Sequence, residues 1–194
     1  MGRFTWSDCR WKGLDSDWPS VGVSVDELPE DLPQFQRYAA GREFVHFHTF
    51  VDDWRQECIW RDPVLKRDRV SGNICTAPDF SVFWGDPLPF VTWQVWRSRL
   101  IAWAWSQAGA KVIPVVQFGD ARSFAVCVQG VRKGSVIAVR GPSRKDVIER
   151  WRSGCLYWAR HVQPELVIQF GRDEGSEVWR KVVNRPLALS SRKG

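Results

Sequence analysis

The run Lys111-Val112-Ile113-Pro114-Val115-Val116-Gln117-Phe118 decides the fold, because it predicts a strand that is buried on both faces. The run is almost continuously apolar, whereas a half-buried strand alternates apolar and polar side chains. A long helical pattern from Pro89 to Gln107 precedes it, and Gly109 ends that pattern. Asp120 follows shortly after, and Asp is favoured at the start of a helix. The segment therefore indicates a strand between two helices.

The same alternation extends in both directions along the chain. Strands are predicted at Phe44–Phe50, Ile74–Ala77, Lys111–Phe118, Ser135–Val139 and Glu165–Phe170. Helices are predicted just after Asp52 and Asp53, and at Pro89–Gln107, Asp120–Val128, Arg144–His161 and Glu174–Val183. Apolar strands separated by helices favour a parallel sheet with right-handed crossovers. The predicted fold class is α/β, with a mainly parallel sheet from five β-α units that forms a partial (β/α) barrel or an open three-layer sandwich.

The two ends of the chain differ in composition from this repeat. Residues 1–42 are rich in Trp, Pro, Asp and Gly without periodicity, which predicts an irregular N-terminal segment that wraps the domain. Residues 43–185 are predicted to form a single α/β domain, and residues 186–194 a basic tail. No apolar run approaches the roughly 18 residues of a membrane helix, and the first residues lack the apolar core of a secretory signal. We therefore expect a cytoplasmic protein without membrane contact.

Composition and missing motifs narrow the function classes. A formal net charge of +6 on 194 residues permits contact with nucleic acid without requiring it. The five cysteines include no Cys-x-x-Cys pair, which argues against a zinc ribbon and a disulfide framework. The G-x-x-x-x-G-K, G-x-G-x-x-G, G-x-S-x-G and H-E-x-x-H motifs are absent. Common NTPases, nicotinamide dehydrogenases, α/β-hydrolases and zinc proteases are therefore disfavoured.

Acidic residues follow three successive predicted strands. Asp52 and Asp53 come after the first, Asp79 after the second and Asp120 after the third. The carboxyl ends of parallel strands share one edge of a sheet, where ligands bind in α/β folds. Converging carboxylates repel one another unless a cation offsets them, and their oxygens suit Mg²⁺ or Mn²⁺. The four aspartates are candidate catalytic residues, with Asp52, Asp79 and Asp120 as candidate metal ligands; alternatively, Asp53 and Asp120 only cap the helices that follow them.

Arginines are the candidate substrate-binding residues. Arg140 and Arg172 follow the last two strands, where a guanidinium group can hold a phosphate by paired hydrogen bonds. Arg97 and Arg99 lie among the tryptophans of the long predicted helix, an arrangement that can stack bases and grip phosphates. The alternative is that this helix packs its rings against the sheet, with at least one of the two arginines exposed or paired.

A further candidate metal ligand is His46, which stands two residues before His48 on a predicted strand, so that both side chains face one side. This pair resembles the His-hydrophobic-His motif of rolling-circle replication and relaxase nucleases, which add a nucleophilic tyrosine on a helix. Tyr157 is the helical candidate here, but His161 stands where those enzymes have a lysine. Their sheet is antiparallel, which conflicts with the predicted β-α alternation.

Five short motifs follow one another between residues 43 and 172. They are Val51-Asp52-Asp53-Trp54, Ala77-Pro78-Asp79-Phe80-Ser81, Trp96-Arg97-Ser98-Arg99 with Gly109, Val112-Ile113-Pro114, and Asp120 with Ser123-Phe124 and Cys127. Together they resemble domain of unknown function 4417, an uncharacterised family carried by phages and plasmids. The resemblance implies a mobile-element protein in a bacterial cytoplasm, with His46, Arg97, Arg99 and the four aspartates at polar positions of the family pattern. His48 departs from that pattern, which expects an aromatic or aliphatic residue there.

Three functions are consistent with these observations. The first is an enzyme that acts on nucleic acid or nucleotide phosphates through a divalent-metal carboxylate site at the strand ends. The second is a module that binds DNA or RNA through an Arg/Trp surface and the basic tail. The third is a non-enzymatic protein that binds a host factor, with exposed tryptophans as anchors.

Overall fold

The computed structural model describes residues 17–30, 36, 37, 44–46, 57, 59–61, 70–142 and 144–185. The strands are β1 (Gln36–Arg37), β2 (Phe44–His46), β3 (Ile74–Thr76), β4 (Lys111–Ile113), β5 (Ile137–Arg140), β6 (Val167–Phe170) and β7 (Val182–Arg185). The α-helices are α3 (Leu88–Gln107), α4 (Phe124–Cys127) and α5 (Ile148–Val162). Short 3-10 turns are η1 (Val25–Glu27), η2 (Ala121–Ser123), η3 (Lys145–Val147) and η4 (Ser176–Val178). Residues 57 and 59–61 are also helical.

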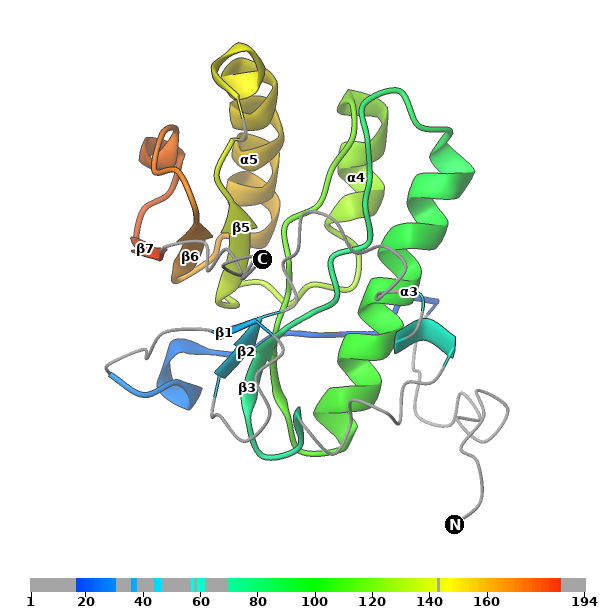
Figure 1. Ribbon diagram of the computed structural model, residues 1–194, viewed down its shortest axis with the longest axis vertical. Coiled ribbons are helices and arrows are strands. Elements are labelled where there is room, and N and C mark those ends of the chain that lie inside the picture. Colours follow the sequence, from blue (N-terminus) through cyan, green and yellow to red (C-terminus); the bar gives the residue numbers. More distant parts are fainter. Residues whose placement is uncertain are drawn as a thin grey trace, which may run out of the picture.

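The strands form two small sheets in which they follow chain order (Figure 1). One sheet contains β1, β2, β3 and β4, and the other β5, β6 and β7. Every strand pair in the described residues is parallel. The order lacks the reversal of a doubly wound sheet, and these residues form no closed barrel, so the arrangement is open. The predicted α/β class with a mainly parallel sheet is confirmed.

Strand β4 is shorter than the predicted strand Lys111–Phe118 because of Pro114. Proline has no backbone N–H, and the ladder between β3 and β4 ends at Ile113. The chain then changes partner: Val115 forms a parallel bridge with Ala138 of β5. There the Val116 N–H donates to the Ala138 carbonyl, and the Ala138 N–H donates to the Pro114 carbonyl. This bridge is the seam between the two sheets.

The sheet of β5 and β6 is buried on both faces, as predicted. Ile137 and Val139 belong to the same buried cluster as Trp158 of α5. Ala138, which points to the other face, belongs with Ile168 to the cluster that contains side chains of β3, β4 and α3. Since both faces contact apolar side chains, the strands read as continuous apolar runs.

The predicted helices of the central region are confirmed. Pro89–Gln107 corresponds to α3, Asp120–Val128 to η2 and α4, and Arg144–His161 to η3 and α5. None of the described helices combines the length and the apolar character that crossing a bilayer requires.

Two predictions near the chain ends differ from the structure. The helix predicted at Glu174–Val183 is wrong: the chain makes the short turn η4 and then strand β7, which pairs with β6. The β-branched Val182 and Val183 favour this extended state. Residues 1–42 were expected to be irregular, but they supply β1 and the buried Val21 and Val23. The predicted basic tail, 186–194, lies outside the described residues.

Candidate functional site

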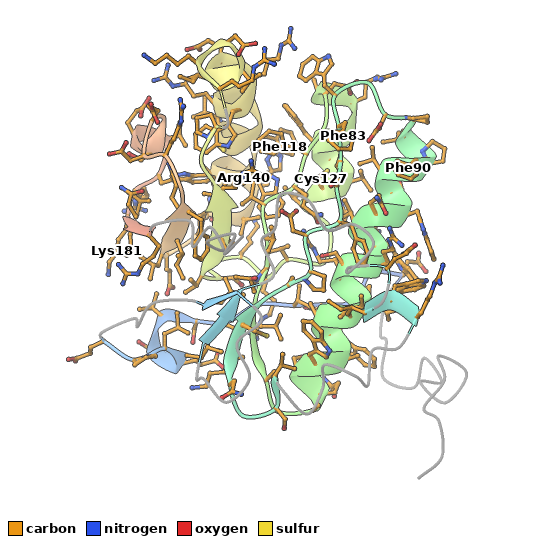
Figure 2. All side chains as sticks on the ribbon, in the orientation of Figure 1. Phe83, Phe90, Phe118, Cys127, Arg140 and Lys181 are labelled. Carbon is orange, nitrogen blue, oxygen red and sulfur yellow. The ribbon has the colours of Figure 1, made fainter. Side chains whose placement is uncertain are left out.

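A pocket of about 350 Å³ lies at the carboxyl ends of β3, β4 and β5. It is lined by Asp79, Ser81, Val82 and Phe83 after β3, by Val116, Gln117 and Phe118 after β4, by Val139, Arg140, Gly141 and Pro142 around the end of β5, and by Val147 and Trp151. Figure 2 shows Arg140 beside α5, Phe118 between α5 and α4, and Phe83 beside α4, all in the upper half of the view. This is the edge at which α/β folds bind ligands, and the volume suits a small one.

Arg140 and Asp79 give the pocket its charged groups. Arg140 is the last residue of β5, and Asp79 follows β3 after only two residues. Burial lowers the pKa of Arg140 from its usual range to about 10, while attraction to Asp79 acts in the opposite direction. Arg140 therefore stays a cation at neutral pH, although it has lost part of its hydration. Its carbonyl accepts a hydrogen bond from Trp151 Nε1 at 2.8 Å, which ties the strand end to α5.

A second guanidinium group, Arg99 of α3, is also attracted to Asp79. Arg99 is fully buried, and this burial lowers its pKa from the usual range to about 10. Its Nε donates to the Gln129 carbonyl at 3.2 Å and its Nη2 to the Cys127 carbonyl at 3.0 Å. Arg99 thus satisfies carbonyls at the C-terminal end of α4. One carboxylate, Asp79, interacts with two guanidinium groups, so this group of side chains carries a net positive charge.

Three side chains hold the backbone that carries Asp79. Ser98 Oγ donates to the Pro78 carbonyl at 2.6 Å, Gln117 Nε2 to the Phe80 carbonyl at 2.6 Å, and Gln94 Nε2 to the Ser81 carbonyl at 2.9 Å. All three donors are buried. Among the described residues, Oε1 of Gln117 has no hydrogen-bond partner and is itself buried. Because the carbonyls on both sides of Asp79 are fixed, its position is set before any ligand arrives.

Aromatic side chains form the walls of the pocket. The Phe118 ring lies on Gly154 of α5 and makes an edge-to-face contact with Phe124 at 5.8 Å. Trp151 packs on Gly175 in the same manner. Flat apolar walls beside a guanidinium group favour a ligand that joins a planar ring to an anion.

The structure places other predicted site residues away from this pocket. Asp120 caps η2: its carboxylate accepts from the Arg122 N–H at 3.1 Å and pairs with the Arg122 guanidinium at 2.5 Å. These side-chain hydrogen bonds lower the pKa of Asp120. Arg172 is exposed and lies 3.8 Å from Glu174. Its backbone, however, touches Gly141, where a β-carbon would stand 2.0 Å from the Arg172 carbonyl oxygen.

The arginines of the long helix are inside the protein. Arg97 is buried, pairs with Glu57 at 2.6 Å and stacks on Phe80 at 3.7 Å. Together with the carbonyl contacts of Arg99, this matches the alternative in which the helix packs against the sheet with its arginines paired. Neither guanidinium group forms a surface for nucleic acid.

The predicted metal ligands are only partly visible. The backbone of His46 belongs to β2, whereas Asp52, Asp53 and His48 lie outside the described residues. Within the part of the chain that is described, no three His, Cys, Asp or Glu side chains gather into a group that could hold a metal ion. Tyr157 packs between Phe124 at 5.5 Å and His161 at 3.8 Å. The parallel strand pairs differ from the antiparallel sheet of the relaxase-type nucleases.

Sequence reasoning missed Gln94, Ser98, Gln117 and Trp151. A signal for the first three existed: they are polar residues inside apolar segments, and Gln94 and Ser98 are four apart on one face of a helix. Nothing in the sequence alone distinguishes Trp151 from the other tryptophans.

Comparison with known proteins identifies the family. Residues 20–183 match the profile of the family described as "Domain of unknown function (DUF4417)". The Gene 1 protein of Mycobacterium phage L5 is 31% identical over 146 residues, which cover 73% of this chain and 63% of the relative. The Gene 1 protein of Mycobacterium phage D29 is 28% identical over 159 residues, 79% of this chain and 58% of the relative. The chain thus spans about three fifths of the length of these relatives. No solved structure matches it.

The match extends from η1 to β7 and includes every residue of the pocket. The predicted resemblance is therefore confirmed: this chain belongs to the family Domain of unknown function (DUF4417).

Proposed function

We propose that the pocket at the ends of β3, β4 and β5 binds the phosphate group of a nucleotide or of a nucleic acid. The observation that carries the proposal is the position of Arg140: its guanidinium-bearing side chain lines a pocket of about 350 Å³ at the strand ends, together with Asp79. Asp79 attracts Arg140 and the buried Arg99, so the positive charge exceeds the negative charge in this group. Burial has removed part of the water around Arg140, as its lowered pKa reflects. A phosphate beside it would restore favourable contacts for that charge.

The walls of the pocket support the second half of such a ligand. The rings of Phe118 and Trp151 line the pocket beside Arg140, and flat rings stack on nucleobases. The relatives named above are proteins of Mycobacterium phages. As part of the proposal, the protein works in the cytoplasm of the bacterial host.

The proposal includes a divalent cation, Mg²⁺ or Mn²⁺, that binds together with the phosphate. Mg²⁺ is commonly held by one or two carboxylates plus phosphate oxygens, not by a complete cage of protein ligands. In the described residues, Asp79 is the pocket-lining carboxylate that offers such a contact. Asp120 pairs with Arg122 and does not line the pocket. Asp52 and Asp53 lie outside the described residues.

Calorimetric titration of mononucleotides, with and without Mn²⁺, tests the proposal. We expect binding to the wild type, a loss of about 10-fold in affinity for Arg140→Gln, and loss of the Mn²⁺ effect for Asp79→Asn. Arg172→Gln is the matched control, because Arg172 is an exposed arginine at the next strand end and does not line the pocket. Equal weakening by Arg140→Gln and Arg172→Gln would show that the positive surface, and not the pocket, attracts the ligand.

Chromatography of the same samples separates a binding protein from an enzyme. Cleavage of the nucleotide by the wild type, and none by Asp79→Asn, would extend the proposal to phosphoryl chemistry with Asp79 as a catalytic residue. An unchanged nucleotide would leave a binding function.

A further inference from the structure

An apolar surface borders the pocket. The described residues contain six large hydrophobic side chains that are strongly exposed, and five of them fall between residues 83 and 93: Phe83, Trp84, Leu88, Phe90 and Trp93. We call these five the apolar rim. On ordinary protein surfaces, exposed hydrophobic side chains are scattered singly. Several of them close together mark an interaction site more often than chance.

The rim and the pocket share one residue. Phe83 belongs to both, since it lines the pocket and is 64% exposed. Figure 2 shows Phe83 and Phe90 at the same end of the molecule as Arg140. A molecule that enters the pocket and is longer than the pocket would therefore pass over these side chains.

The loop that carries Phe83 and Trp84 has a fixed shape, whereas Leu88, Phe90 and Trp93 lie on α3. The Phe83 N–H donates to the Asp86 carboxylate at 2.7 Å, and the Asp86 N–H donates to the Phe83 carbonyl at 3.3 Å. Gly85 lies within this turn at φ 89°, a conformation that other residues rarely adopt. Rings on such a turn lose little conformational entropy when a partner covers them.

The surroundings of the rim are basic. The Arg150 guanidinium lies over the Trp84 ring, 4.8 Å from its centroid, and so brings α5 next to the rim. The sequence from 140 to 152 contains five Arg or Lys residues and two acidic residues. Both acidic residues are in ion pairs, Asp146 with Arg144 and Glu149 with Arg152. Rings interleaved with guanidinium groups suit a partner that has both flat bases and phosphates.

We propose that a single strand of DNA or RNA runs from the pocket across the apolar rim, with bases stacked on Trp84 and Phe90 and with backbone phosphates near Arg140 and Arg150. This inference rests on the proposed function, in which the pocket holds a phosphate. It excludes double-stranded DNA as the preferred partner, because the faces of paired bases are hidden in the stack. A mononucleotide occupies the pocket alone and does not reach Trp84 or Phe90.

Fluorescence anisotropy with labelled oligonucleotides of about 12 bases tests the inference, with DNA and RNA in separate arms. We expect Trp84→Ala and Phe90→Ala each to weaken single-strand binding by about 10-fold and to leave the calorimetric titration of a mononucleotide unchanged. Leu156→Ala is the matched control, because Leu156 is the sixth exposed hydrophobic side chain and lies on α5. Trp84→Phe keeps a flat ring and should recover most of the affinity. Thermal unfolding of each variant shows that it is folded.

The outcomes separate the rim from the pocket. Unchanged oligonucleotide binding by Trp84→Ala and Phe90→Ala overturns the inference, even when mononucleotides bind. If Trp84→Ala and Phe90→Ala weaken oligonucleotide binding but no mononucleotide binds, the inference about the rim stands and the proposed function of the pocket is wrong. Binding of duplex as tightly as single strand overturns the inference. Absence of any oligonucleotide binding by the wild type also overturns it.

Discussion

The ring of Phe118 occupies the place that a β-carbon on Gly154 would take. An ideal β-carbon built on Gly154 would stand 2.4 to 2.5 Å from three carbon atoms of that ring. Contacts so short are impossible, so Phe118 and any larger residue at position 154 exclude each other. Because Phe118 lines the pocket, a glycine on α5 determines the position of one pocket wall.

We expect Gly154→Ala to move Phe118 and to weaken ligand binding. Alanine favours a helix over glycine by about 1 kcal/mol, but overpacking costs about 1 to 3 kcal/mol, so the net effect on stability should be a loss. Urea denaturation measures it. Ser153→Ala, at the exposed neighbouring position, is the control and should be close to neutral. A Gly154→Ala protein that is more stable than the wild type would mean that the ring relocates freely.

Replacement of Arg99 should be among the most destabilising changes in the protein. Arg99→Leu removes the donors that satisfy the Cys127 and Gln129 carbonyls. A buried carbonyl that loses its partner costs about 1 to 3 kcal/mol, so we expect a loss of about 2 to 4 kcal/mol in the free energy of unfolding. Arg99→Lys keeps the positive charge but lacks the several donors of a guanidinium group. Its free energy of unfolding should lie between those of the wild type and Arg99→Leu. Chemical denaturation of the three proteins tests this order, and equal stability of wild type and Arg99→Leu would contradict the capping role.

The contribution of Asp120 to stability should depend on pH. Hydrogen bonds from the Arg122 side chain lower the pKa of this carboxyl below its ordinary value of 3.8. A carboxyl with a lowered pKa in the folded state stabilises the fold above its unfolded pKa and loses that effect as the pH falls through the folded pKa. Asp120→Ala should therefore lower the Tm by about 2 to 4 °C at neutral pH. At acidic pH, thermal scans should show a smaller difference in Tm between the wild type and Asp120→Ala. A difference that does not change with pH would assign the effect to packing alone.

The buried thiols should be inert in the folded protein. Cys75, Cys127 and Cys155 are free and buried, and burial raises the pKa of Cys127 to about 11 and that of Cys155 well above 9.0. The thiolate is the reactive form. In a variant in which Cys9 and Cys58 are replaced by serine, we expect no reaction with Ellman's reagent at neutral pH until denaturant is added. Rapid labelling of the native variant would reveal local opening of the core.

Sequence reasoning found the fold class because both-sided burial leaves a clear pattern. The nearly continuous apolar runs of β5 and β6 are typical of parallel strands buried between two layers. The prediction of a helix at Glu174–Val183 is wrong at β7. Two valines next to charged residues are too short a pattern to distinguish a strand from a helix. Sequence reasoning also could not foresee that Pro114 divides one apolar run between two sheets, because only the tertiary arrangement supplies the second partner, Ala138.

The site was predictable where topology alone determines position. Arg140 ends β5 and Asp79 follows β3 after two intervening residues, and both side chains line one pocket. Asp120 also follows a strand, but a local cap and an ion pair take up its carboxylate. Arg97 and Arg99 lie on opposite sides of α3, and the sequence does not reveal that both sides are buried.

Pro114 also has a consequence for how the molecule unfolds. It leaves the backbone ladders of the two sheets connected through the bridge between Val115 and Ala138, although the sheets also share a buried apolar cluster. The pocket lies across that bridge, with Asp79 on one side and Arg140 on the other. A ligand that contacts both residues would bind only while the two sheets are held together. Its binding would therefore oppose their separation during unfolding. We expect the two sheets to exchange amide hydrogens as separate units in the free protein and as one cooperative unit when the pocket is filled.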